Sequence, residues 1–176
     1  LAPLQREFGW TRAQVSLAFT LSIAFIAVGV LTGGLWHDRK GPAPVALTGA
    51  LLFSAGIFLS SYTHALWWLY GCYGVLVGFA SGVGYVCPLG VGMKWFPEKR
   101  GLVTGLMVMG YGAGSALIAP LAGLLLHRYG WRDTFALLGL GFLVVTTTGS
   151  FFLRNPPDGW RPAGWVVVAA GVSLLV

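Results

Sequence analysis

Charged residues are scarce in this sequence: they make up 9% of it, with only 5 Asp and Glu against 11 Lys and Arg. Soluble domains carry about 25% charged residues, so the charged surface that keeps such a domain in solution is missing. This scarcity excludes a soluble enzyme, a disordered tail and a nucleic-acid-binding module. The cations lie in short gaps between long apolar runs, an arrangement typical of a polytopic membrane protein.

Residues able to form disulfides, bind metals or act as nucleophiles are also few. Cys72 and Cys87 share one apolar run; on a helix they are about 22 Å apart, beyond the reach of a disulfide. We expect both to be inert core residues. His37, His64 and His127 lie at the edges of apolar runs, where we expect interfacial side chains rather than metal ligands. No zinc-ligand spacing, CxxC pair or nucleophile motif is present, so the sequence predicts no metal site, no cofactor and no enzyme.

Five long uncharged runs dominate the chain instead. Each reaches the ~20 residues that a helix needs to cross about 30 Å of hydrocarbon, and none alternates as the strands of an outer-membrane barrel do. The sequence therefore predicts an all-α, polytopic transmembrane helical bundle over residues 1–154 in the cell (inner or plasma) membrane. Its predicted spans are about 15–36, 43–62, 65–93, 101–126 and 134–153.

The end of the chain has a different character. Pro156 and Pro157 end the last helix and open a loop over residues 155–163, because proline cannot continue a helix. The apolar segment 164–176 has only 13 residues, which is too short to span a bilayer. The sequence also begins without Met, and we expect an internal piece of a longer protein.

Positive charge is uneven between the two sets of loops. The set richer in Lys and Arg normally faces the cytoplasm. The richer set holds Arg39, Lys40, Lys94, Lys99, Arg100, Arg154 and Arg161, and the poorer set holds Arg6, Arg12, Arg128 and Arg132. This bias predicts that the loop at 155–163 is cytoplasmic.

The turn between the first two spans has the sequence GLWHDRKG, residues 34–41. Gly34 permits a close helix approach, Asp38 is an anion able to cap a helix or pair with a cation, and Gly41 supplies a backbone shape that other residues resist. The spacing G-xxx-D-R-x-G resembles the signature loop between the second and third helices of the major facilitator superfamily. The resemblance implies a cytoplasmic latch between two halves of a transporter, built on Gly34, Asp38, Arg39 and Gly41.

This loop departs from the family pattern at one place. Pro42 stands where the family often continues with Arg, so a salt bridge assigned to that arginine does not carry over. A plainer interpretation of the loop is a solvated charged turn that only sets topology.

A second motif, KWFPEKRG at residues 94–101, combines an interfacial Trp, a helix-ending Pro and a basic cluster. It resembles the loop between the fourth and fifth helices of the same superfamily, in the form of the oxalate:formate antiporter family and the related monocarboxylate transporters. The stretches FGWTR at 8–12, RYGWR at 128–132 and PPDGW at 156–160 add to this resemblance. It covers residues 3–163 and implies the second to sixth helices of the amino-terminal half.

Glycines recur at helical spacing in two of the predicted spans. One stripe is Gly74, Gly78 and Gly82, and the other contains Gly110 and Gly114. Small residues at this spacing let helix backbones pack closely in a membrane. The 3.6-residue period also places Tyr85 and Pro88 near the face of the first stripe, and Pro88 should bend its helix. Packing alone explains both stripes; a sharper interpretation is that the bend and the small residues open a central cavity.

Tyr85 is the best candidate for contact with a substrate, because its hydroxyl is a polar group in an apolar span. The resemblance supports it, since this helix contributes an aromatic residue to the substrate cavity in the antiporter family. Tyr111 and Ser115, one turn apart, are weaker candidates whose hydroxyls more often bond a neighbouring helix. No charged residue lies inside the spans, so we expect no proton coupling through them, and cations for an anionic substrate in the missing second half.

The sequence therefore predicts part of a secondary transporter that moves small organic anions, such as mono- or dicarboxylates, by alternating access. Its expected partners are the solute, the bilayer and the second half of the same chain, and not nucleic acid. Two alternatives stay open: a non-transporting scaffold or receptor bundle, and a membrane-embedded enzyme. The signature loop argues against the first, and the lack of a nucleophile or acid–base pair in the spans argues against the second.

The charge bias makes a topological prediction. Residues 37–40 and 94–100 should face the cytoplasm, and residues 63–64 and 127–132 the outside, because the first set of loops carries more Lys and Arg. Single cysteines in these loops, probed with an impermeant thiol reagent on intact cells, should label only in the second set. Labelling of the 37–40 loop from outside would reverse the assignment.

Overall fold

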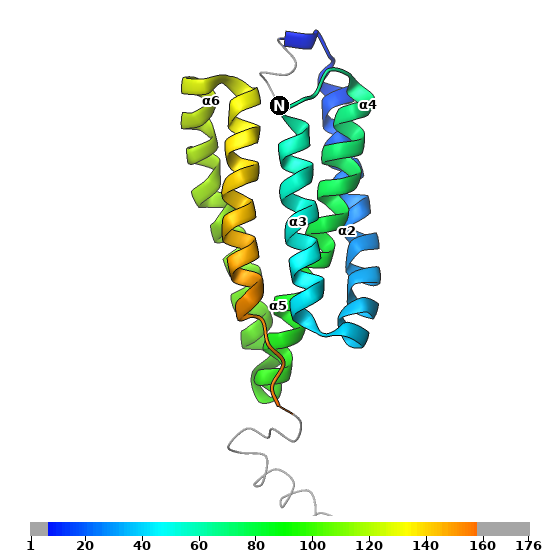
Figure 1. The fold of residues 1–176 in the computed structure, drawn as a ribbon, viewed down its shortest axis with the longest axis vertical. Coiled ribbons are helices and arrows are strands. Elements are labelled where there is room, and N and C mark those ends of the chain that lie inside the picture. The colour runs from blue at the N-terminus through cyan, green and yellow to red at the C-terminus, as the bar shows by residue number, and fades with distance from the viewer. Residues whose placement is uncertain (1–6, 158–176) are drawn as a thin grey trace, which may run out of the picture.

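The computed structural model describes residues 7–157, and this part of the chain is a bundle of helices (Figure 1). The apolar segment 164–176 and most of the expected loop at 155–163 lie outside the described residues. The helical elements are α2 Arg12–Lys40, α3 Pro42–Ser60, α4 Leu66–Leu69, η1 Tyr70–Val77, α5 Gly78–Trp95, η2 Pro97–Lys99 and α6 Arg100–Phe152. The predicted all-α bundle is confirmed.

The longest element, α6, folds back on itself at Gly130. This glycine has φ 76° and ψ 177°, a conformation that glycine adopts readily and other residues resist. Figure 1 shows the two legs running beside each other, and they contain the predicted spans 101–126 and 134–153. Within residues 7–157, four stretches of helix are able to cross a membrane by length and composition, and the last of them, Pro97–Phe152, includes both legs.

The start and the end of α2 are both fixed by backbone chemistry. At the start, Thr11 accepts a hydrogen bond from the Gln14 amide at 3.3 Å, and the Gln14 side chain accepts one from the Thr11 amide at 2.9 Å. This reciprocal pair satisfies amides that have no partner within the helix. At the end, Gly41 has φ 83° and ψ 174°, and its amide donates to the carbonyl of His37 at 2.9 Å. Because Pro42 begins α3, the turn between the two helices is a single residue.

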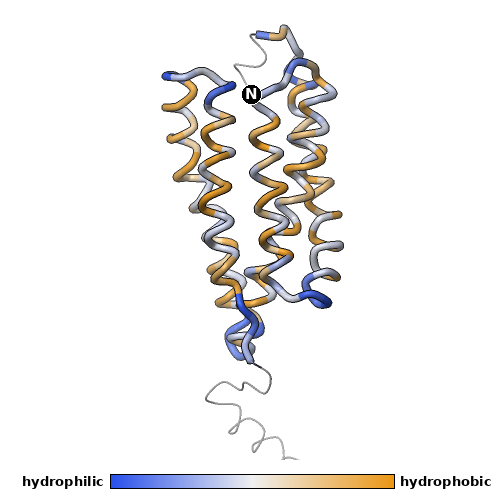
Figure 2. The backbone as a smooth tube through the Cα atoms, in the orientation of Figure 1, coloured by the Kyte–Doolittle hydropathy of each residue, from blue (hydrophilic) through white to orange (hydrophobic). Residues whose placement is uncertain are grey.

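The connections alternate between the two ends of the bundle (Figure 1). The α2–α3 turn, the α5–α6 connection and the C-terminal end of α6 lie at one end, and the α3–α4 connection and the break in α6 lie at the other. Hydrophilic residues gather at these two ends of the bundle, and hydrophobic residues lie between them (Figure 2). At the first end, the Trp95 indole N–H donates to the carbonyl of Arg154 at 2.9 Å. This arrangement agrees with the two sets of loops that the charge count separates.

Helix α5 packs against α2 at backbone distance. A Cβ atom added at Gly78 would lie 2.5 Å from the carbonyl oxygen of Ser22, and one at Gly74, in the preceding element η1, would lie 3.1 Å from Leu21 Cβ. On α2, a Cβ at Gly33 would lie 2.9 Å from Val83 Cα. Glycines from both helices therefore form this interface, as membrane helices require for close packing.

The other helices complete the bundle around α5. Gly49 of α3 faces α5, where a Cβ would lie 3.2 Å from the amide nitrogen of Gly84. The second leg of α6 packs on α3, and a Cβ at Gly139 would lie 2.9 Å from the amide nitrogen of Phe58. Each of these contacts again uses a glycine on one side.

The packing role expected of Gly110 and Gly114 is not seen. Within residues 7–157, a Cβ atom at either position would meet nothing within 4 Å. The first leg of α6 contacts α5 near the start of α6 instead, where Gly92 faces Val103 and Met107. Spacing alone predicts a face for close packing, but it does not supply a neighbour for that face.

The predicted single helix over residues 65–93 differs from the structure at its start. Tyr70–Val77 forms a π-helix, η1, between α4 and α5. In a π-helix the hydrogen bonds run from i to i+5, which changes the direction of successive side chains. Gly74 in this segment nevertheless contacts α2, as Gly78 does.

Adding a methyl group in the α2–α5 interface should destabilise the bundle. Gly78→Ala places its Cβ against the backbone of Ser22, and overpacking of this kind costs about 1–3 kcal/mol. The matched control is Gly84→Ala in the same helix, where the added Cβ meets nothing within 4 Å. Thermal unfolding in detergent should show a lower midpoint for the first variant only; equal midpoints would contradict the close packing.

Candidate functional site

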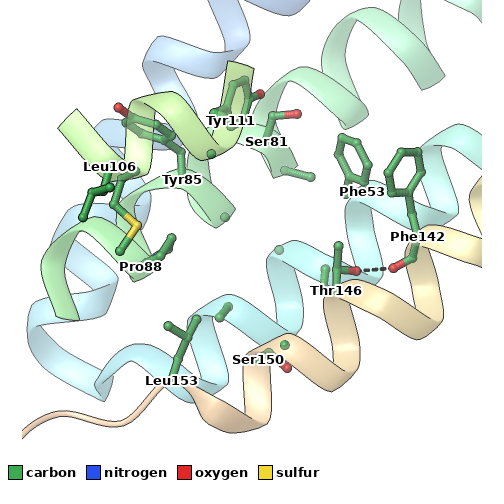
Figure 3. Close-up of a pocket in the computed structure, with 18 residues that line it drawn as sticks. Phe53, Ser81, Tyr85, Pro88, Leu106, Tyr111, Phe142, Thr146, Ser150 and Leu153 are labelled. Carbon is green, nitrogen blue, oxygen red and sulfur yellow. Dashed lines mark hydrogen bonds between the residues drawn. The ribbon is translucent and has the colours of Figure 1, made fainter. Parts of the chain in front are cut away.

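A cavity of about 580 Å³ lies between α3, α5 and the two legs of α6. Figure 3 shows side chains from these elements around it, with the aromatic pair Phe53 and Phe142 on one side and Tyr85 and Tyr111 on another. Small residues of α3 and α5, among them Gly49, also line it and leave room between the backbones. The cavity is open on one side, since Tyr111 and Leu106 in its lining are largely exposed.

The lining hydroxyl groups fall into two classes. Ser81, Thr146 and Ser150 each donate to a carbonyl of their own helix, at 2.7, 2.5 and 2.7 Å. Tyr85 and Tyr111 have no such bond within residues 7–157, and their rings meet edge to face with centroids 5.8 Å apart. The two phenols are thus the lining groups whose O–H donors are free for a ligand.

Among residues 7–157, no charged side chain lines the cavity. An apolar cavity of this size with a few polar groups is the usual form of a small-molecule site. Two phenols can donate hydrogen bonds to an anion, but they cannot neutralise its charge. Within the described part of the chain, no group of three or more His, Cys, Asp and Glu gathers in one place.

The structure brings together two of the three predicted substrate-binding residues. Tyr85 and Tyr111 share the cavity, whereas Ser115 does not line it. Ser115 is exposed, and its hydroxyl donates to the carbonyl of Gly112 at 2.7 Å. The sequence also did not reveal Phe53 and Phe142, because an aromatic residue in an apolar span carries no sign of the face that it occupies.

Tyr85 and Pro88 line the cavity, next to the glycine stripe that packs on α2. Gly78 and Gly82 of this stripe face α2. Three residues along an α-helix correspond to a rotation of about 300°, which is about 60° in the opposite sense, so Tyr85 lies next to Gly82 on the helix surface. The face of α5 that packs on α2 therefore borders the strip that lines the cavity.

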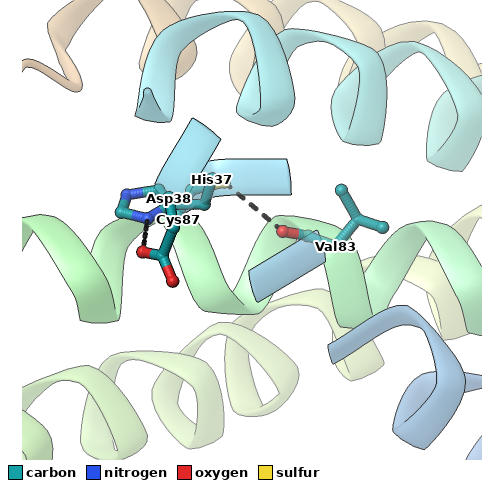
Figure 4. A network of polar contacts seen from close by, with 4 residues as sticks. All are labelled: His37, Asp38, Val83 and Cys87. Atoms are coloured by element: carbon teal, nitrogen blue, oxygen red, sulfur yellow. Dashed lines mark hydrogen bonds and ion pairs between the residues drawn. The ribbon is translucent and has the colours of Figure 1, made fainter. Parts of the chain in front are cut away.

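The signature loop lies away from the cavity, and its buried side chain is that of His37, not that of Asp38. Asp38 is 75% exposed, and its carboxylate lies 3.4 Å from His37 Nδ1 (Figure 4). It does not cap α3, whose first turn has no side-chain cap. A Cβ atom added at Gly34 would lie 3.9 Å from Val86 Cγ1 of α5, and Arg39 is exposed. His37 itself is only 3% exposed, so its side chain lies between helices in the last turn of α2 and not on the surface of the loop.

Comparisons with known proteins agree with these features. The human protein monocarboxylate transporter 11 is 34% identical over 173 residues, which is 97% of this chain and 37% of that protein. The oxalate:formate antiporter of Oxalobacter formigenes is 30% identical over 154 residues, or 88% of this chain and 37% of that protein. An MFS-type transporter of Escherichia coli, YhjX, is 31% identical over 145 residues, or 82% of this chain and 36% of that protein.

The chain thus spans little more than a third of the length of these curated relatives. The family profile described as Major Facilitator Superfamily matches residues 1–175. Together with the long apolar helices, this match shows that the chain belongs to the Major Facilitator Superfamily and forms part of a multi-pass integral membrane protein.

Proposed function

We propose that the complete protein is a secondary transporter of small organic anions, such as mono- or dicarboxylates, and that this chain supplies most of one half of it. The observation that carries the proposal is the pair of free phenols, Tyr85 and Tyr111, in an otherwise apolar and uncharged cavity. The printed names of the relatives, monocarboxylate transporter and oxalate:formate antiporter, support the class of substrate.

The phenols have a defined role in this proposal. Each O–H donates a hydrogen bond to a carboxylate oxygen, a charge-assisted bond that contributes about 1.5–3 kcal/mol. The apolar walls, Phe53 and Phe142 among them, exclude water and limit the size of the anion. The compensating cation comes from outside this cavity, since none lines it. Carriers of this kind build their sites near the midplane, between two repeats.

The signature loop has a separate role. Asp38 is 75% exposed and its only described contact is the weak one with His37, so its charge is available to a helix end or a cation of the other half. Such a contact exists in only one state of a rocking carrier, and it therefore biases the equilibrium between states. Gly41, at φ 83°, keeps the turn to one residue and so fixes where Asp38 stands.

Transport by the full-length protein in reconstituted vesicles tests the proposal. Labelled oxalate, formate, lactate and pyruvate are offered outside, with the unlabelled anion inside to permit exchange. Uptake of at least one of them, competed by the others and absent from vesicles without protein, is the expected result. Folded protein that moves none of these anions, and binds none of them by calorimetry, contradicts the proposal.

Removal of the Tyr85 hydroxyl should weaken binding of the anion. Tyr85→Phe keeps the ring beside Tyr111 but removes the donor, and the affinity should fall by about 1.5–3 kcal/mol, or roughly 10- to 150-fold. Tyr85→Ala should have a larger effect because the cavity also loses a wall. The measurement is affinity in vesicles, normalised to folded protein; Ser115→Ala, outside the cavity, is the matched control. Unchanged affinity in both Tyr85 variants would remove this residue from the site.

Neutralising Asp38 should slow transport without harming insertion. Asp38→Asn keeps the size of the side chain and removes a charge that contributes about 1 kcal/mol in one state, enough to shift a two-state balance about fivefold. The exchange rate should fall while the amount of inserted protein stays the same. Glu98→Gln, an exposed acid of η2, controls for charge at this end. A rate equal to that of the natural protein would leave Asp38 as a topology marker only.

A further inference from the structure

His37 occupies an unusual place for a histidine in the last turn of α2. It is only 3% exposed, and its ring lies against Gly90 of α5. A Cβ atom added at Gly90 would lie 2.9 Å from Cε1 and 3.2 Å from Nε2 of the ring. The imidazole thus fills the space that a side chain at position 90 would otherwise take, and it joins α2 to α5 at this end of the bundle.

The two ring nitrogens have different surroundings. Nδ1 lies 3.4 Å from Asp38 Oδ1 (Figure 4), and that carboxylate is 75% exposed. Nε2 is buried and has no hydrogen-bond partner within residues 7–157. A neutral ring that donates from Nδ1 to the carboxylate leaves Nε2 as an acceptor without a donor. This nitrogen is therefore the position at which the ring can take up a proton.

We propose that His37 is a proton-binding site that controls the contact between α2 and α5. In the neutral form the ring packs against Gly90. Uptake of a proton at Nε2 separates the end of α2 from α5 and moves the loop that carries Asp38. This inference concerns a helix contact in this chain and does not depend on which solute the full protein carries.

The cost of burying charge gives the direction of the effect. A protonated ring at this position would bury a charge, and Nε2–H would be a donor without an acceptor; both are unfavourable. Asp38 offsets only part of this, because its exposed carboxylate is screened by water and salt. The packed state is therefore favoured at higher pH and is lost as pH falls. With one proton taken up, the balance changes by at most about tenfold per pH unit.

Within residues 7–157, the helices that pack on α2 bring no other acid to the ring. α3 and α4 contain no titratable residue, and η1 contacts the opposite end of α2, where the Tyr70 hydroxyl donates to the carbonyl of Gln14 at 2.9 Å. On α5, the thiol of Cys87 donates to the carbonyl of Val83 at 3.4 Å. The cations at this end of the two helices are Arg39 and Lys40 on α2 and Lys94 in the last turn of α5, all of them exposed, and these disfavour a further positive charge.

Spin labels in the full-length protein test the proposal. Native cysteines are replaced, and labels are attached to Lys40→Cys and Lys94→Cys, two exposed positions at the ends of α2 and α5. The distance between the labels is measured by electron paramagnetic resonance between about pH 8 and about pH 5, where imidazole changes charge. We expect a second population with a longer distance to appear as pH falls. The ratio of the long-distance to the short-distance population should rise by up to about tenfold per pH unit.

Three variants test whether His37 is the group that takes up the proton. His37→Asn cannot take up a proton and should show no pH response, while His64→Asn, an exposed histidine at the other end, should respond as the natural protein does. Gly90→Ala pushes the ring away and should show the longer distance already at high pH. A distance that does not change with pH, or a response that persists in His37→Asn, overturns the proposal. If His37→Asn does not fold, a Gly90→Ala variant with only the short distance overturns it equally.

Discussion

The approach of α2 and α5 at backbone distance is the constraint on which the rest of the bundle depends. In lipid, burial of apolar surface drives helices together only weakly, so packing of small residues has to supply the contact. Gly78 against Ser22 and Gly33 against Val83 bring the two backbones together. Because one face of α5 is committed to α2, the face that carries Tyr85 and Pro88 is left to line the cavity.

The same line of contact connects the cavity to the signature loop. Followed along α5 from Gly82 and Val83, it ends at Gly90, which meets the buried ring of His37. Next to this ring are Asp38 and the one-residue turn at Gly41. Tightly packed interfaces shift between discrete arrangements rather than deform continuously. On the proposal made above, release of His37 from Gly90 therefore opens one end of the α2–α5 contact, next to the loop that carries Asp38.

Sequence was informative wherever a feature depends on a single residue or a single run. Hydropathy located the apolar helices, and the need for a positive φ made Gly41 the natural end of the turn. Features that need a partner were not accessible. Gly110 and Gly114 have the spacing of Gly74 and Gly78, yet only the latter pair meets a neighbour within residues 7–157. The burial of His37 likewise depends on Gly90, which is 53 residues away in the chain, and no local pattern links them.

Energies set a limit on what this cavity does for an anion. Two phenolic hydrogen bonds to a carboxylate contribute about 1.5–3 kcal/mol each, whereas moving an ion out of water costs at least several kcal/mol. Tyr85 and Tyr111 therefore roughly offset that cost at best. On the proposed function, the described half selects its substrate by size and by the position of two donors. The attraction that brings the anion in has to come from cations that this cavity does not contain, and the two tasks are divided between separate parts of the carrier.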